Sequence, residues 1–538
     1  MSNYLPNFRS RIRWRMRWIT LASIAPALLG IAGPAASAQG EPLAAGAHVA
    51  SLARKAPNRS ATYIVQFKAG VSEAQAKGLV RARGGHVVSS VAIIHGLAVR
   101  ISAHGALVLA KSPLVKGVSL NGHVKSQATA VNVSQLESAY DGASLATNSW
   151  GDGFSGLGVG VAVIDSGVAG DLQDFDVSPT NPASRVVASA VVNPEATSAN
   201  DPYGHGTDVA GIIAGNGWNL PASNPARGDY IGIAPNANLI SIKAGNNNGN
   251  ATVLDVINGL AFAVEHQAEY NIRVVNLSLS SETAQSYKLD PLDAAVETAW
   301  FHGIVVVAAA GNLGNTPGAV NYAPGNDPYV ITVGAYDDHG SAGPGDDSLA
   351  PYSSQGVTQD GFAKPELIAP GSHIASTLAP GSEFSRLCPS CISGGSYIKA
   401  SGTSMAAPVV SGAVALLLQK YPSLTPNQVK GALLANAVSK WGLKALATKP
   451  TLDHALAAKA ADQGLTPSAG AEGVETSNVS TTRSSWRRSS WRVAPESLTA
   501  PWARSSWSCL GSVVEGASVD PTRSSWSRSS WNTDLVGQ

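Results

Sequence analysis

The chain has 538 residues, of which 44% are hydrophobic and only 14% are charged. This composition excludes a wholly disordered protein and supplies enough apolar side chains for a large core. Lys and Arg total 37 against 36 Asp and Glu, so the net charge does not indicate a polyanionic partner such as a nucleic acid.

The first 38 residues predict a secretory signal peptide. Five arginines within residues 9–17 precede an apolar stretch of residues 19–32, and Ala36-Ser37-Ala38 supplies a small-residue cleavage site. A membrane anchor is the alternative. The apolar stretch, however, is interrupted by Pro26 and is shorter than the ~20 residues that a membrane span needs. We therefore expect a secreted, extracellular protein that is cleaved near Ala38.

Residues 61–126 predict a small α/β module. Strand-like stretches at 62–67, 86–94, 96–101 and 115–120 alternate with helical patterns at 71–85 and 104–112. This β-α-β-β-α-β order is typical of a compact module, which we place in a segment of residues 39–130.

A second pattern begins near residue 159. Apolar strands are expected at 159–165, 238–244, 272–279, 304–312 and 329–335, and helices at 253–266, 291–303 and 402–418. Val- and Ile-rich strands that alternate with helices predict a mostly parallel sheet covered on both faces, which is an α/β fold. Reactive residues in such sheets gather at the carboxyl ends of the strands.

The last part of the chain, residues 448–538, predicts a flexible tail. The sequence RSSW occurs five times, beginning at Arg483, Arg488, Arg504, Arg523 and Arg528. One interpretation is a flexible polar segment. The other is an adhesive tail that contacts a cell surface or polysaccharide through Arg and Trp side chains.

Three cysteines leave the disulfide chemistry open. Cys388 and Cys391 could close a small loop in an exported protein, whereas Cys509 has no evident partner. Disulfides are therefore not expected to be the scaffold of the fold.

Three polar residues stand at strand ends or helix starts among small residues. Asp165 ends the strand VAVID, His205 lies between two glycines in YGHGTDVAG, and Ser404 opens the apolar helix of GTSMAAPVV. Each one alone could be a turn or helix cap. Together they supply a weak nucleophile, a base that takes its proton, and a carboxylate that orients the base. We expect one hydrogen-bonded line of these three groups, with Pro408 in about the first turn of the helix, where a missing N–H is tolerated.

The blocks VAVIDSG, HGTDVAGIIAG and GTSMAAPVVSG resemble the three catalytic blocks of the subtilisin-like serine proteases, in the same order. The resemblance implies a three-layer subtilisin-like fold over residues 131–447 and a secreted endopeptidase that hydrolyses peptide bonds of proteins. It implies that Asp165 orients, His205 is the general base and then acid, and Ser404 attacks. It also implies that the N-terminal module is an inhibitory propeptide, so the protein is made as a zymogen.

The resemblance extends to an oxyanion hole and a substrate strand. Asn312, after the strand IVVVAAAG, matches the oxyanion asparagine of the family. The segment Ser278-Leu279-Ser280 resembles the strand that pairs with a substrate backbone, although the family usually has glycine where Ser280 stands. Ala309-Ala310-Gly311 resembles one wall of the pocket for the residue before the cut, and its small side chains suggest room for a large apolar residue.

No cofactor is expected for the chemistry, and a monomer is expected. Structural calcium is common in the resembled family, but Asp174 and Asp176 are only suggestive and no metal site is assigned. Two other functions stay open. One is a catalytically silent binding protein that acts through its Arg/Trp tail. The other is an esterase, which GTSMA disfavours because it is not G-x-S-x-G.

Overall fold

The computed structural model describes residues 45–126 and 139–471. The predicted signal peptide, the RSSW repeats and Cys509 lie outside the described residues. Within these two ranges, no helix is both long enough and apolar enough to cross a membrane.

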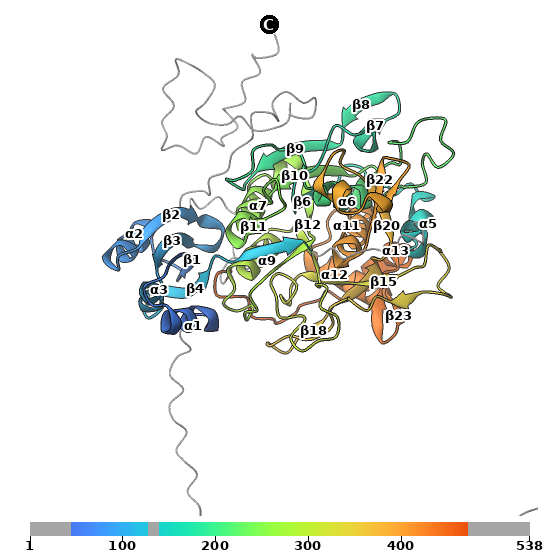
Figure 1. The fold of residues 1–538 in the computed structure, drawn as a ribbon. Helices are drawn as coiled ribbons and strands as arrows, with labels where there is room; N and C mark the ends of the chain where they lie inside the picture. Colours follow the sequence, from blue (N-terminus) through green and yellow to red (C-terminus); the bar gives the residue numbers. More distant parts are fainter. Residues whose placement is uncertain (1–44, 127–138, 472–538) are drawn as a thin grey trace, which may run out of the picture. The chain divides into compact units, whose positions relative to one another are not determined.

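The N-terminal module has the predicted β-α-β-β-α-β order, preceded by one more helix (Figure 1). Its sheet runs in the order β2-β3-β1-β4, and β1 pairs antiparallel with β3 and with β4. The elements are α1 (Ala47–Lys55), β1 (Ser60–Phe67), α2 (Glu73–Ala82), β2 (His86–Val91), η1 (Ala92–Ile94), β3 (Gly96–Ser102), α3 (Ala103–Leu109) and β4 (Val115–Leu120). A capping box starts α2, because the Ser72 side chain accepts from the Gln75 backbone and the Gln75 side chain accepts from the Ser72 backbone.

A large sheet forms the centre of the second part, in the order β23-β24-β19-β15-β14-β12-β6-β10-β9, with β16 paired to β15. From β9 to β24 neighbouring strands are parallel, whereas β23 and β16 are antiparallel additions. The strands are β6 (Gly160–Asp165), β9 (Val186–Val191), β10 (Asn238–Lys243), β12 (Ile272–Leu277), β14 (Val305–Ala309), β15 (Ile331–Asp337), β16 (Ser348–Leu349), β19 (Leu367–Pro370), β23 (Val438–Lys440) and β24 (Leu443–Ala445). Strands β6 and β14 are buried along their whole length, as expected for a sheet covered on both faces.

Helices cover both faces of this sheet. Figure 1 shows α7 and α9 on one side of β6 and β12, and α6 and α11 on the other. The longer helices are α6 (His205–Ala214), α7 (Val253–Glu265), α9 (Pro291–Phe301), α11 (Thr403–Lys420) and α12 (Pro426–Asn436). The shorter ones are α4 (Tyr140–Ala143), α5 (Ala146–Trp150), α8 (Gln267–Tyr270), α10 (Glu383–Leu387) and α13 (Thr448–His454). The three-layer α/β architecture predicted from the sequence is confirmed.

Smaller sheets and 3-10 turns lie outside the large sheet. The strands are β5 (His123–Ser126), β7 (Asp176–Ser178), β8 (Asn181–Ser184), β11 (Ala251–Thr252), β13 (Leu279–Ser281), β17 (Gly356–Val357), β18 (Ala363–Lys364), β20 (Ile374–Thr377), β21 (Ile392–Ser393) and β22 (Tyr397–Ala400). The 3-10 turns are η2 (Gln173–Phe175), η3 (Pro389–Cys391) and η4 (Ala455–Ala457).

The predicted start of the flexible tail at residue 448 is wrong. Helix α13 begins at Thr448, and Thr448, Thr451 and Leu452 are buried. The chain then packs along the core up to residue 471: the Ala461 N–H donates to the Asn427 carbonyl at 2.8 Å. Buried side chains, rather than a strong hydrophobic pattern, fix this segment, which is why the sequence did not reveal it.

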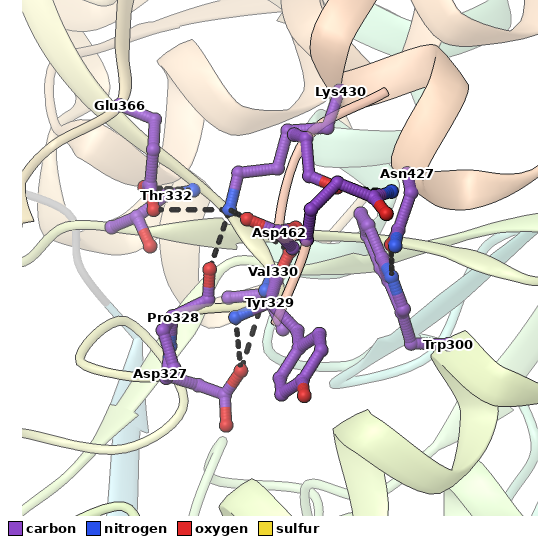
Figure 2. A network of polar contacts seen from close by, with 12 residues as sticks. Trp300, Asp327, Pro328, Tyr329, Val330, Thr332, Glu366, Asn427, Lys430 and Asp462 are labelled. Atoms are coloured by element: carbon purple, nitrogen blue, oxygen red, sulfur yellow. Dashed lines mark hydrogen bonds and ion pairs between the residues drawn. The ribbon is translucent and has the colours of Figure 1, made fainter. Parts of the chain in front are cut away.

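A buried lysine ties this C-terminal segment to the core. Lys430 Nζ donates to the carbonyl oxygens of Pro328 at 2.6 Å and Tyr329 at 3.1 Å. It also lies 3.1 Å from an Asp462 carboxylate oxygen and 3.3 Å from one of Glu366 (Figure 2). A buried ammonium is stable only with such partners, so the ion pair with Lys430 fixes the position of Asp462 against the core.

Candidate active site

Asp165 and His205 meet at the carboxyl end of the central strand. Asp165 is the last residue of β6, and His205 is the first residue of α6. His205 Nδ1 lies 2.8 Å from Asp165 Oδ1, so the ring donates to the carboxylate when Nδ1 carries the proton. The preceding Gly204 has a φ of 104°, which only glycine adopts readily, and this turn allows the helix to start on the histidine.

The charges around His205 set its protonation. Burial alone lowers the pKa of His205, but the negative charge of Asp165 and its hydrogen bond to the ring outweigh burial and raise the pKa. Asp208, one turn further along α6, is fully buried, and burial raises the pKa of its carboxyl group well above the usual value. The negative charge of Asp208 acts, like that of Asp165, to raise the pKa of His205.

Asp201 organises the loop that carries His205, and sequence reasoning missed it. One carboxylate oxygen accepts from Ser166 Oγ at 2.8 Å and from the Gly204 N–H at 2.7 Å. The other accepts from Thr207 N at 2.8 Å and from Thr207 Oγ1 at 2.7 Å. One buried side chain thus links the residue after Asp165 to both flanks of His205. Its only signal in the sequence is an aspartate four residues before the histidine, which alone reads as a turn residue.

A buried lysine balances this acidic loop. Lys243, the last residue of β10, donates to the backbone oxygens of Asn200, at 2.9 Å, and Ser166. Burial lowers the pKa of Lys243 to about 8, although the charges of Asp201 and Asp165 act to raise it. The loop is therefore held by backbone bonds to a cation as well as by its own carboxylate.

Ser404 is the second residue of α11, and Ser278 holds it from the sheet side. Ser404 Oγ donates to the Ser278 carbonyl at 3.0 Å, and Ser278 Oγ donates to the Ser404 carbonyl at 2.8 Å. The prediction for Pro408 was wrong: it is the sixth residue of α11 and lies inside the helix. Because Pro408 has no N–H to give to the carbonyl four residues earlier, the Ser278 hydroxyl donates to that carbonyl instead.

Of the two hydrogen bonds expected between Asp165, His205 and Ser404, the structure has the one between Asp165 and His205. Helices α6 and α11, which carry His205 and Ser404 in their first turns, pack against each other. His205 Nε2 is nevertheless buried without a hydrogen bond to any residue in the described ranges, while Ser404 Oγ faces Ser278. Catalytic hydrogen bonds are often loose before a substrate binds, so this arrangement is compatible with a resting site.

Asn312 is fixed beside the start of α11. Its amide oxygen accepts from Thr403 N at 3.0 Å and from Thr403 Oγ1 at 3.1 Å, and Thr403 Oγ1 also accepts from the Gly311 N–H at 3.1 Å. With the amide oxygen directed at Thr403, the amide nitrogen is the atom that can donate to a substrate. The predicted oxyanion asparagine therefore lies next to the predicted nucleophile.

The predicted substrate strand pairs with the chain itself. In the antiparallel register, Leu279 lies opposite Ser126 and Ser280 opposite residue 125, so β13 pairs with β5. On its other edge β5 pairs with β11, where Ala251 lies opposite Val124. The Val124 side chain is buried and lines a small pocket together with Leu279 and Ala251. The end of the N-terminal module thus forms the middle strand of a three-stranded sheet on the peptidase part.

The remaining predicted substrate residues have mixed positions. The Ser278 side chain is buried and points to α11, so it supports the helix. Ala309 ends β14, and Ala310 donates to the Val333 carbonyl at 2.9 Å; both are buried. Gly311 has a φ of 99° and leads directly to Asn312.

Of the two aspartates considered for calcium, Asp174 is engaged by other residues of the chain. Asp174 is buried, and its carboxylate accepts hydrogen bonds from Thr377 Oγ1, Tyr397 Oη and the Asn219 N–H. Residues 45–126 and 139–471 hold no cluster of three or more His, Cys, Asp or Glu side chains suited to a metal. The open question about Cys388 and Cys391 has an answer, because the two sulfurs form a disulfide.

Comparison with known families decides the class of this site. The family model described as "Subtilase family" matches residues 156–472, which is more than half of the chain. The chain belongs to the subtilase family. The prediction of a subtilisin-like serine protease is confirmed, and by family the protein is a serine-type endopeptidase.

Curated relatives of this subtilase are bacterial proteases. Serine protease AprX of Bacillus subtilis (strain 168) is 38% identical over 298 residues, which cover 54% of this chain and 63% of AprX. Subtilisin E of the same strain is 31% identical over 397 residues, which cover 72% of this chain and 88% of subtilisin E. The chain therefore spans slightly less than two thirds of AprX but most of subtilisin E.

A solved structure shares the fold. Fervidolysin from Fervidobacterium pennivorans, described as a keratinolytic enzyme related to subtilisin, matches with a TM-score of 0.55 and 24% identity. The match covers 74% of this chain and 62% of fervidolysin. This likeness supports the fold of the subtilase and no finer property.

Proposed function

We propose that this subtilase is a secreted endopeptidase, made as a zymogen, that cleaves protein substrates with Ser404 as nucleophile. The observation that carries the proposal is the Asp165–His205 hydrogen bond at 2.8 Å, together with a serine in the first turn of α11, the helix that packs on the helix of His205. A carboxylate on Nδ1 fixes the tautomer in which Nε2 is a base, and it stabilises the imidazolium that forms.

In this mechanism a rotation about the Cα–Cβ bond turns Ser404 Oγ from the Ser278 carbonyl toward His205 Nε2. The hydroxyl then attacks the peptide carbonyl as the ring takes its proton, and the ring later gives the proton to the leaving amine. The developing oxyanion is stabilised by the amide nitrogen of Asn312, together with the N–H groups at the start of α11. No metal or other cofactor takes part in these steps.

Self-inhibition is proposed from the position of β5. A peptide substrate would add a strand between β11 and β13, and these edges are paired to residues 123–126 of the same chain. Ser126 lies opposite Leu279, and the residue before Leu279 is Ser278, whose carbonyl accepts from Ser404. We therefore place self-cleavage within a few residues after Ser126.

Further contacts hold the N-terminal module on the peptidase part. Gln66 Nε2 and Ser119 Oγ donate to the Leu289 carbonyl at 3.4 and 3.3 Å, and Gln285 Nε2 donates to Ser119 Oγ at 2.8 Å. Two sets of contacts, at the cleft and at a separate face, explain how the module would stay bound after cleavage. Export of the protein, its monomeric state and surface binding by the RSSW tail remain parts of the proposal that rest on the sequence.

The test compares the full-length protein with Ser404→Ala. The wild type should release peptides from casein and lose its N-terminal module, with a new N-terminus shortly after Ser126. The Ser404→Ala protein should do neither and should keep the module attached. A folded wild type as inert as Ser404→Ala would contradict the protease function and favour a silent binding protein.

A further inference from the structure

A disulfide-closed insertion separates two strands just before Ser404. The connection from β20 to β22 covers residues 378–396 and contains α10, η3 and β21. Cys388 and Cys391 are bridged within it, with Cα atoms 5.3 Å apart. Neither the proposed mechanism nor the family blocks use this insertion.

The insertion reaches the ring of His205 through Phe384. The two ring centroids are 6.0 Å apart and the planes meet at 74°, which is the edge-to-face arrangement that aromatic pairs favour. Phe384 also lies 6.2 Å from the Tyr203 ring. Phe384 is therefore a side chain of α10 that contacts the proposed catalytic base directly.

Backbone bonds join the same insertion to the residues that precede His205. The Phe384 N–H donates to the Tyr203 carbonyl, and the Glu383 N–H donates to the Pro202 carbonyl, both at 2.8 Å. At Gly204 a Cβ atom would lie 2.8 Å from the Phe384 Cβ, so the two segments approach as closely as glycine allows. A displacement of α10 would thus move the turn that places His205.

Packing around the disulfide fixes Phe384. Buried Leu378, Cys391 and Ile398 form a cluster, against which Phe384, Cys388 and Ile392 pack. Helix α10 has only five residues, too few for a helix that is stable by itself. The bridge and this cluster therefore hold the helix, and the helix holds the aromatic ring.

From this geometry we propose that Phe384 is a positioning residue for His205, kept in place by the Cys388–Cys391 disulfide. The inference rests on the proposed function, in which His205 is the base. Loss of the Phe384 ring lets the imidazole tilt out of line with Ser404, and misplacement of a reacting group by about 1 Å can reduce the rate on the order of 100-fold. Reduction of the bridge acts in the same direction: a dithiol supplies two electrons, two cysteine thiols form, and the dithiol closes to its own disulfide.

The first test replaces Phe384 with alanine and uses Leu387→Ala as the matched control. Leu387 is on the same helix but 63% exposed, and it belongs to no cluster with the bridge. In the matured protein, Phe384→Ala should reduce kcat about 10- to 100-fold with little change in KM. Leu387→Ala should change neither kcat nor KM.

The pH profile separates positioning from a merely structural role. The charged and titratable groups that face His205 are Asp165, Asp208 and Asp201. All three stay in place in Phe384→Ala, while water gains access to the ring and the effect of burial weakens. The acidic limb of the kcat/KM profile should therefore move to higher pH in Phe384→Ala, and it should not move in Leu387→Ala.

The second test does not depend on the folding of a variant. In a Cys509→Ser background, Cys388 and Cys391 are the only cysteines left, so a dithiol can reduce only their disulfide. Activity should fall in proportion to the two thiols released, and it should return when the disulfide is reoxidised. The Cys388→Ser/Cys391→Ser protein has no disulfide to reduce, so its kcat should be lowered to the same extent with and without the dithiol. An active protein that keeps its kcat and pH profile after full reduction, or in Phe384→Ala, would overturn the inference. A wild type that never cleaves casein would instead overturn the proposed function.

Discussion

Replacement of Asp201 by asparagine is the sharpest test of how the loop of His205 is built. The carboxylate accepts four hydrogen bonds of 2.7–2.8 Å from Ser166, Gly204 and Thr207. Asparagine has the same shape but only one acceptor oxygen, so two of the four donors lose their partner and face an NH₂ group. Hydrogen bonds to a charged group contribute about 1.5–3 kcal/mol each, which gives an expected loss of about 3–6 kcal/mol in the free energy of unfolding.

Urea denaturation in a Ser404→Ala background measures this loss without self-digestion. The matched control is Asp171→Asn, because Asp171 is exposed in the loop after β6 and should change stability by less than about 0.5 kcal/mol. In the active background, Asp201→Asn should also lower kcat, since the backbone loses the bond either to the Gly204 N–H before His205 or to the Thr207 N–H after it. A loss of stability below about 1 kcal/mol would refute the view that Asp201 organises this loop.

Three further outcomes are expected. Asn312→Asp keeps an acceptor for Thr403 but loses the donor, so kcat should fall about 100- to 1,000-fold in peptide hydrolysis with little change in KM. Val124→Asp places a carboxylate in a buried site of β5 and should weaken the pairing of this strand. In a catalytically inactive background, trypsin should therefore cut β5 faster. The control is Val88→Asp on β2, which should have no effect because the Val88 side chain is 53% exposed. Because the pKa of His205 is raised and catalysis needs the neutral ring, kcat/KM should fall as the pH drops through a midpoint above about 6.5. The same shift means that the charged ring stabilises the fold below about pH 6.5, and that this contribution to unfolding free energy is lost as the pH rises through the folded pKa.

The elements that sequence predicted best are those fixed by local pattern. The strands that end at Asp165 and near Asn312 are runs of Val, Ile and Ala, and such runs have few alternatives to a buried parallel strand. The residue types at Asp165, His205 and Ser404 carry chemistry that a core position does not need. Their joint occurrence in one sequence therefore indicates the site.

The residues that sequence missed act through long-range contacts. Asp201 looks like a turn residue until its four donors are known, and Phe384 looks like an ordinary apolar residue until it meets His205. The same holds for helix α13, whose polar sequence TKPTLDH gives no clear period although its buried face packs on α12. Pairing of Val124 with Ala251 joins positions more than 120 residues apart, which no local pattern encodes.

Support for His205 therefore comes from three sides, each with a different physical character. Asp165 holds one ring nitrogen by a charged hydrogen bond, Asp201 holds the backbone on either side, and Phe384 packs edge-to-face with the ring from a separate segment. Of these, only the last depends on a covalent bond that reducing conditions can open. The disulfide and the buried carboxylate thus predict different behaviour: a dithiol should lower the rate while the fold stays stable, whereas Asp201→Asn should lower both together. A dithiol that lowered stability as strongly as Asp201→Asn would mean that the insertion supports the whole peptidase part and not the ring of His205.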